Sequence, residues 1–88
     1  MAISANVLVS SAGTPVPLGS GMVNCPVAIK AMHANTGLVA VCDPAVTLSE
    51  GYHLNKDEYI ILHVSSLENV YIDSAVDGEG VNYILLNV

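Results

Sequence analysis

The hydrophobic positions of this chain recur in short runs, and most of these runs have the two-residue period of a β-strand. Residues 59–64 place every second side chain, all of them apolar, on one face. Residues 70–73 alternate in the same way, and residues 81–86 form a run that is apolar on both faces. The pattern predicts three adjacent C-terminal strands. Their predicted core residues are Ile60, Leu62, Val64, Val70, Ile72, Val81, Tyr83 and Leu85.

The upstream strand segments are shorter and less regular. Residues 27–33 and 38–42 flank Asn35-Thr36-Gly37, which is typical of a hairpin turn because glycine accepts positive φ. Residues 7–9 and 15–18 give weaker strand patterns. Two prolines in the second of these segments restrict it to a sheet edge or an extended arm.

Turn sequences rich in Gly, Pro, Asn and Asp recur about every ten residues, as in antiparallel sandwiches and small barrels. Residues 47–50 and 65–68 have the form of a helix start, but each predicts one turn at most because a glycine or a β-branched run follows. The chain is therefore predicted to be all-β, a single antiparallel β-sandwich or jelly-roll-like domain of seven to eight short strands. We expect an extended N-terminal arm with the first strand over residues 1–18 and the sandwich body over 19–88.

Charged residues are scarce in this chain. They make up 11% of it against 52% hydrophobic residues, whereas about 25% is usual in soluble domains. A domain of 88 residues has a large surface for its volume, so neutral polar and apolar side chains must face outward. Surfaces of this kind are usually covered by other subunits. We therefore expect the protein to work as part of an assembly.

The net charge is −6, and Lys30 and Lys56 are the only Lys or Arg residues. This charge limits the classes of partner that the protein is expected to bind. Nucleic acid and anionic membranes would be repelled, because both are bound mainly through Lys and Arg. No run of about 18 apolar residues predicts a membrane span, and the first residues lack the basic start of a signal peptide. We expect protein partners, no nucleic acid and no membrane.

Metal sites find little support in the sequence. His33, His53 and His63 follow no known ligand spacing. The segment Asp77-Gly78-Glu79-Gly80 has too few oxygen ligands for a calcium loop and is typical of a hairpin turn. We therefore expect no metal and no cofactor.

Catalytic patterns are also missing. No G-x-S-x-G turn occurs, and the adjacent carboxylates Asp57 and Glu58 would point to opposite faces of a strand. Cys25 and Cys42 lie in no redox or metal spacing, and we expect two free buried thiols rather than a disulfide. The sequence predicts a protein that is not an enzyme.

Several motifs nevertheless form a recognisable series. Gly-Thr-Pro-Val-Pro-Leu at residues 13–18 precedes the Asn-Thr-Gly turn, and a Leu-x-x-Val-Tyr-Ile-Asp strand covers residues 67–73. The turn at residues 77–80 then leads into the last strand. This series resembles small β-sandwich virion proteins of tailed phages, above all head decoration (cement) proteins. Asp57 stands where such proteins often have glycine, and aspartate accepts the same turn conformation.

The resemblance implies a structural protein on the outer surface of a phage head, made in the host cytoplasm and bound to the major capsid protein, with a homotrimer favoured. A tail or neck accessory protein that binds a receptor or glycan is the alternative, and a small metal-dependent enzyme is a third.

An apolar arm would gain burial by lying on a neighbouring subunit, and outward tyrosines are common at interfaces. We expect Tyr59 and Tyr71 to be neighbours on one outward face. We also expect deletion of residues 1–9 to leave the sandwich folded. The predicted interface residues are Ile3, Val7, Leu8, Val9, Val16, Leu18, Tyr59 and Tyr71.

Overall fold

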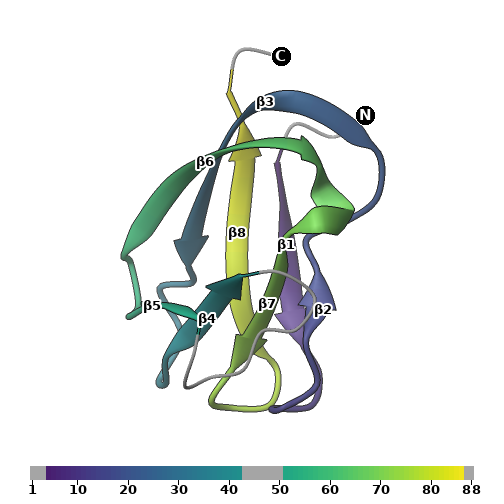
Figure 1. The fold of residues 1–88 in the computed structure, drawn as a ribbon. Coiled ribbons are helices and arrows are strands. Elements are labelled where there is room, and N and C mark those ends of the chain that lie inside the picture. The colour runs from purple at the N-terminus through teal and green to yellow at the C-terminus, as the bar shows by residue number, and fades with distance from the viewer. Residues whose placement is uncertain (1–3, 43–50, 87–88) are drawn as a thin grey trace.

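Two four-stranded antiparallel sheets make up the computed structural model, which describes residues 4–42 and 51–86 (Figure 1). A single 3-10 turn, η1 (Leu67–Asn69), precedes the seventh strand. The predicted all-β sandwich is confirmed. The strands are β1 (Ser4–Val9), β2 (Val16–Pro17), β3 (Met22–Ala31), β4 (Val39–Cys42), β5 (Tyr52–Leu54), β6 (Tyr59–Ser66), β7 (Tyr71–Ser74) and β8 (Glu79–Leu85).

The strand order shows how the chain is wound. The first sheet has the order β1-β8-β3-β6 and the second β2-β7-β4-β5. Strand β1 pairs with β8, β2 with β7, β3 with β6 and β4 with β5, always antiparallel. The chain is therefore one long hairpin whose two arms pass together from sheet to sheet. This arrangement is a jelly roll.

The hairpin predicted around Asn35-Thr36-Gly37 is wrong. β3 and β4 belong to different sheets, so these residues form a crossover. The Asn35 side chain donates to the carbonyl of Gly80 at 2.8 Å and accepts from its N–H at 3.4 Å. Turn-forming residues suit a link between sheets as well as a link within one, and the apolar faces of β3 and β4 must meet across the core.

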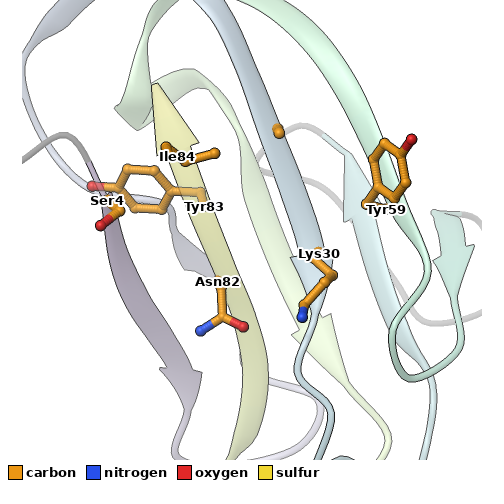
Figure 2. A pocket seen from close by; sticks show the side chains of 7 residues that line it. Ser4, Lys30, Tyr59, Asn82, Tyr83 and Ile84 are labelled. Atoms are coloured by element: carbon orange, nitrogen blue, oxygen red, sulfur yellow. The ribbon is translucent and has the colours of Figure 1, made fainter. Parts of the chain in front are cut away.

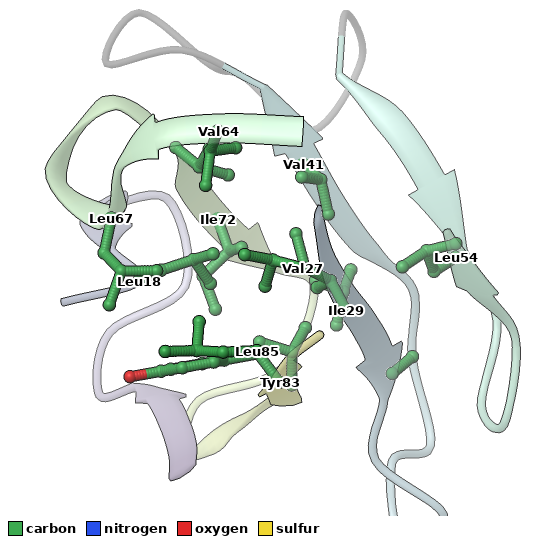
Figure 3. Close-up of a cluster of buried hydrophobic side chains, with 14 of the residues drawn as sticks. Leu18, Val27, Ile29, Val41, Leu54, Val64, Leu67, Ile72, Tyr83 and Leu85 are labelled. Atoms are coloured by element: carbon green, nitrogen blue, oxygen red, sulfur yellow. The ribbon is translucent and has the colours of Figure 1, made fainter. Parts of the chain in front are cut away.

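Most of the predicted core is confirmed. Figure 3 shows Val64, Ile72, Tyr83 and Leu85 among the side chains buried between the sheets. Val70 and Val81 are buried too, whereas Ile60 and Leu62 face inward but are only half-buried, because β6 lies at a sheet edge.

The three C-terminal strands are not adjacent, which corrects the prediction. β3 separates β6 from β8, and β7 belongs to the second sheet. The strand β5 was not predicted, since three residues are too few to show a period. Cys25 is a free buried thiol, and the side chain of Cys42 lies outside the described part of the chain. The predicted turn at residues 47–50 also lies outside it, and the predicted single turn near residues 65–68 is confirmed as η1.

The predicted N-terminal arm over residues 1–18 is wrong for the part that the structure describes. All six residues of β1 pair with β8, and β2 pairs with β7, so this segment supplies an edge strand to each sheet. Gly80 permits the close approach of β1, because a Cβ there would overlap the carbonyl oxygen of Val7. Deletion of residues 1–9 would uncover the β8 edge, and it is now expected to destabilise the fold.

The carboxylate of Glu79 accepts hydrogen bonds from the crossover between β3 and β4. Glu79, the first residue of β8, accepts from the N–H and hydroxyl of Thr36 at 2.8 and 2.9 Å and from the N–H of Gly37 at 3.0 Å. The hydrogen bond from Gly37, followed by those from Thr36, holds the pKa of Glu79 below its ordinary value of 4.5. The crossover is thus stabilised by the ionised form of Glu79.

Ile72 is fully buried in β7 and offers a test of the core. Ile72→Ala is expected to lower the free energy of unfolding by about 2–5 kcal/mol, because it removes buried methyl groups and leaves a cavity. Chemical denaturation measures the change. Leu62→Ala is the matched control and should cost less, since Leu62 is half-buried. Equal losses in the two variants would contradict this assignment of the core.

Stability should fall in acid through Glu79. Its folded-state pKa is lowered, so its contribution is fully present above about pH 4.5 and is lost as the pH falls through the folded-state value. Glu79→Gln should lower the melting temperature at neutral pH, because the amide nitrogen cannot accept these bonds. The difference between wild type and variant should shrink as the pH is lowered to about 3. A difference that stays constant over this range would exclude the carboxylate as the cause.

Candidate interaction surface

One face of the first sheet packs on the core, and the other faces solvent. The pairing register aligns its outward side chains in rows across the four strands. One row consists of Ser4, Ile84, Ala28 and Ile61, and the next of Asn6, Asn82, Lys30 and Tyr59. We call this surface the outer face, and we define it as these eight residues together with Leu8, Pro26 and His63.

The outer face carries little charge. Lys30 is its one Lys, Arg, Asp or Glu side chain, although the protein has a net charge of −6. The acidic residues that the structure describes lie in turns, at the start of β8, in η1 or in the second sheet. They are Asp57, Glu58, Glu68, Asp73, Asp77 and Glu79.

Large apolar side chains are exposed on the outer face. Leu8, Ile61 and Ile84 expose 49%, 54% and 42% of their surface, and Tyr59 exposes 63%. A shallow hollow of about 390 Å³ crosses the middle of the face between Tyr59 and Ile84, with Lys30 beside it (Figure 2). The outer face is therefore an uneven sheet surface with exposed apolar side chains.

A second apolar hollow lies where β6 borders the opening between the two sheets. It measures about 600 Å³. It is lined by Val41, Tyr52, Ile60, Ile61, Leu62, Asn69 and Val70. Both Ile60 and Leu62 point into the sandwich, and their incomplete burial follows from this opening.

The N-terminal residues predicted to form an interface are divided by the structure. Val9 and Leu18 are 0% and 3% exposed in this chain's own core, so their prediction as partner contacts is wrong. Val7 and Val16 are half-buried and pack against the same core. Leu8 alone of these residues lies on the outer face, because it points opposite to Val7 and Val9 along β1.

The two predicted tyrosines do not lie together. Tyr59 belongs to β6 in the first sheet, and Tyr71 belongs to β7 in the second, so the prediction of one shared face is wrong. Tyr71 is half-buried, whereas Tyr59 is exposed on the outer face. Ile3 lies outside the described residues. Of the predicted set, Leu8 and Tyr59 stay candidates for contact with a partner.

Sequence reasoning missed Ile61 and Ile84 as surface residues. The signal was present: the two-residue period that places Ile60 and Leu62 inward also places Ile61 outward. The same argument from Tyr83 and Leu85 places Ile84 outward. Their alignment in one row could not be predicted, because it depends on β3 lying between β6 and β8.

A polar cluster joins the end of β3 to the turn before β6. The Nδ1 atom of His33 lies 2.6 Å from Oδ2 of Asp57, and Nζ of Lys30 lies 3.9 Å from Oδ1. The hydrogen bond with His33 lowers the pKa of Asp57, and the charges of His33 and Lys30 act in the same direction. Asp57 has φ of 67° and its N–H donates to the carbonyl of Ala31.

This cluster has a structural explanation. Aspartate is among the residues that accept positive φ, and the side-chain bond to His33 holds the turn in place. No nucleophilic side chain appears among its contacts in the described residues. Across the described ranges, no three His, Cys, Asp or Glu side chains gather in a way that could hold a metal ion.

Comparison with protein-family models, curated proteins and solved structures found no match. The described part of the chain contains no helix long and apolar enough to cross a membrane.

Proposed function

We propose that this protein is a non-enzymatic structural protein that binds a larger protein assembly through the outer face. The observation that carries the proposal is the exposure of four large side chains on a sheet surface with Lys30 as its one permanent charge. Burying unpaired charges is costly, and burying apolar surface is favourable. This surface is therefore a large area that costs little to desolvate.

The rest of the molecule supports one-sided attachment. The acidic side chains of the described residues lie outside the outer face, and all of them except the buried Asp73 stay in contact with solvent when that face is covered. They also oppose adhesion between other faces of two copies, because like charges repel. A neutral or basic protein surface is the partner that this distribution suits.

We propose further that the assembly is the outer shell of a tailed-phage head, with the major capsid protein as partner and several copies of this chain associating there. The motif series that resembles decoration proteins supports this step. So does the fold, since jelly rolls are common among viral shell proteins, although lectins share them and fold alone does not specify function. Such a protein is made in the host cytoplasm and gains stability from binding.

Copy number in purified virions tests this proposal. Quantitative mass spectrometry of particles from a host that carries the gene should find the chain in amounts comparable to the major capsid protein. A few copies per particle would favour the tail or neck protein that binds a receptor or glycan. Absence from virions would overturn the proposal.

A charge placed on the outer face tests the surface itself. Ile84→Lys should fold, because Ile84 is 42% exposed, and should lower occupancy on particles at least about tenfold by placing a second positive charge in the contact. Thr14→Lys is the matched control, since Thr14 is exposed outside the outer face. Occupancy is measured by adding each variant to particles that lack the protein. Equal occupancy of the two variants would exclude the outer face.

A further inference from the structure

β6 is a long edge strand of the first sheet. Among the described residues it pairs with β3 alone, over a length of eight residues. It contains no proline and no Lys, Arg, Asp or Glu, which are the residues that normally protect an edge strand from pairing. By contrast, the edge strands β2 and β5 of the second sheet have two and three residues.

The backbone of β6 points alternately to β3 and to this open edge. The N–H of Ala31 donates to the carbonyl of Glu58, which makes residue 58 a hydrogen-bonded position. In an antiparallel pair these positions recur at every second residue, so residues 60, 62 and 64 bond to β3. The N–H and C=O groups of Tyr59, Ile61 and His63 therefore point to the open edge, up to the register shift opposite Ser65.

The apolar hollow of about 600 Å³ lies beside the same strand. It is where Ile60 and Leu62 are half-buried, although both point into the sandwich. A strand added to β6 would place every second side chain over this opening. The edge thus offers backbone bonds and apolar burial together, which is the pattern of β-strand addition.

We propose that a second copy of this chain occupies the edge, with the two β6 strands pairing antiparallel about a two-fold axis at Leu62. This register places residue 59 opposite residue 65 of the second copy, and residue 61 opposite residue 63. All three residues that point to the open edge then lie opposite a residue of the second copy. Leu62 of each copy meets Leu62 of the other beside the opening, and Ile60 lies opposite Val64 of the other copy.

The charged residues in and beside β6 are compatible with a second copy at this edge. No Lys, Arg, Asp or Glu side chain lies within β6, so self-pairing opposes no permanent like charges there. Lys56 and Glu68 each lie six residues from Leu62, on opposite sides, so the two-fold axis brings Lys56 of one copy toward Glu68 of the other. At the Lys56 end, the two nearby carboxylates already have partners within their own copy. Asp57 contacts His33 and Lys30, and Glu58 accepts from the N–H of Asn55.

The pairing has a consequence for attachment, and this step rests on the proposed function. Strand spacing and rise give the outer face of one copy an area of roughly 500 Å², which is less than the ~800 Å² per partner of a standard interface. Two first sheets joined through β6 form one eight-stranded sheet with roughly 1,000 Å². The pairing gives a dimer in place of the trimer that the resemblance implies.

Amide hydrogen exchange by NMR tests the pairing on the purified wild-type protein. The amides of residues 60, 62 and 64 should be protected at every concentration, because they bond to β3. Those of residues 61 and 63 should gain at least about tenfold protection between about 10 µM and 1 mM, as the dimer forms. Sedimentation should show the dimer over the same range.

Three outcomes would overturn the inference. They are an unchanged exchange rate at the amides of residues 61 and 63, a persistent monomer, and a trimer in which β1 and β6 amides are protected together. The last would indicate a head-to-tail ring of copies through the two edges of the first sheet.

A matched pair of variants isolates the backbone bond. His63→Pro removes an N–H that points to the open edge and none that bonds to β3, so it should weaken the dimer at least about tenfold. His63→Ala removes the side chain alone and should dimerise like wild type. Equal dimerisation of the two variants would refute the pairing. Ile84→Lys should still dimerise, so its loss of particle binding reports on the proposed function separately.

Discussion

The contact between the crossover at residues 35–37 and the first two residues of β8, Glu79 and Gly80, is the constraint on which the two-sheet arrangement depends. Asn35 bonds both backbone groups of Gly80, and Glu79 bonds the next two residues of the crossover. β1 lies against the same glycine from the other side. Elements of both sheets are therefore positioned by two residues of β8. Asn35 and Gly80 are buried, and leaving one of their polar groups unpaired would cost about 1–3 kcal/mol.

These contacts join residues that are far apart in the sequence, which also explains which parts of the fold could be predicted from the sequence. The two-residue period depends on local geometry, so it correctly separated Leu62 and Tyr83, which face inward, from the residues beside them. Strand partners depend on distant residues: Val9 pairs with Glu79, and nothing near Val9 indicates this. For the same reason the sequence predicts an arm on a neighbouring subunit, whereas β1 completes a sheet of its own chain.

The candidate surface shows the same division. Scarcity of charge predicted that some surface would be covered, but the location of that surface required the strand order. Ile61 and Ile84 lie on different strands and become neighbours across Ala28 only because β3 separates β6 from β8. The carboxylates of the described residues lie in turns, at the start of β8, in η1 or in the second sheet, and Lys30 is the one Lys, Arg, Asp or Glu side chain of the outer face. The carboxylates and the large exposed apolar side chains of the first sheet thus lie on different parts of one small molecule.

The winding of the chain as one long hairpin also sets an order of closure. Val39 and Leu54, paired near the tip, are 15 residues apart, whereas Ser4 and Ile84, paired near the chain ends, are 80 residues apart. If each pair closed independently, the difference in chain entropy would disfavour the outer pair by about 1.5 kcal/mol. Zippering from the tip removes that penalty, because each closed pair shortens the loop for the next. The terminal strands then join last, and the sheet that carries the outer face is the slower one to complete.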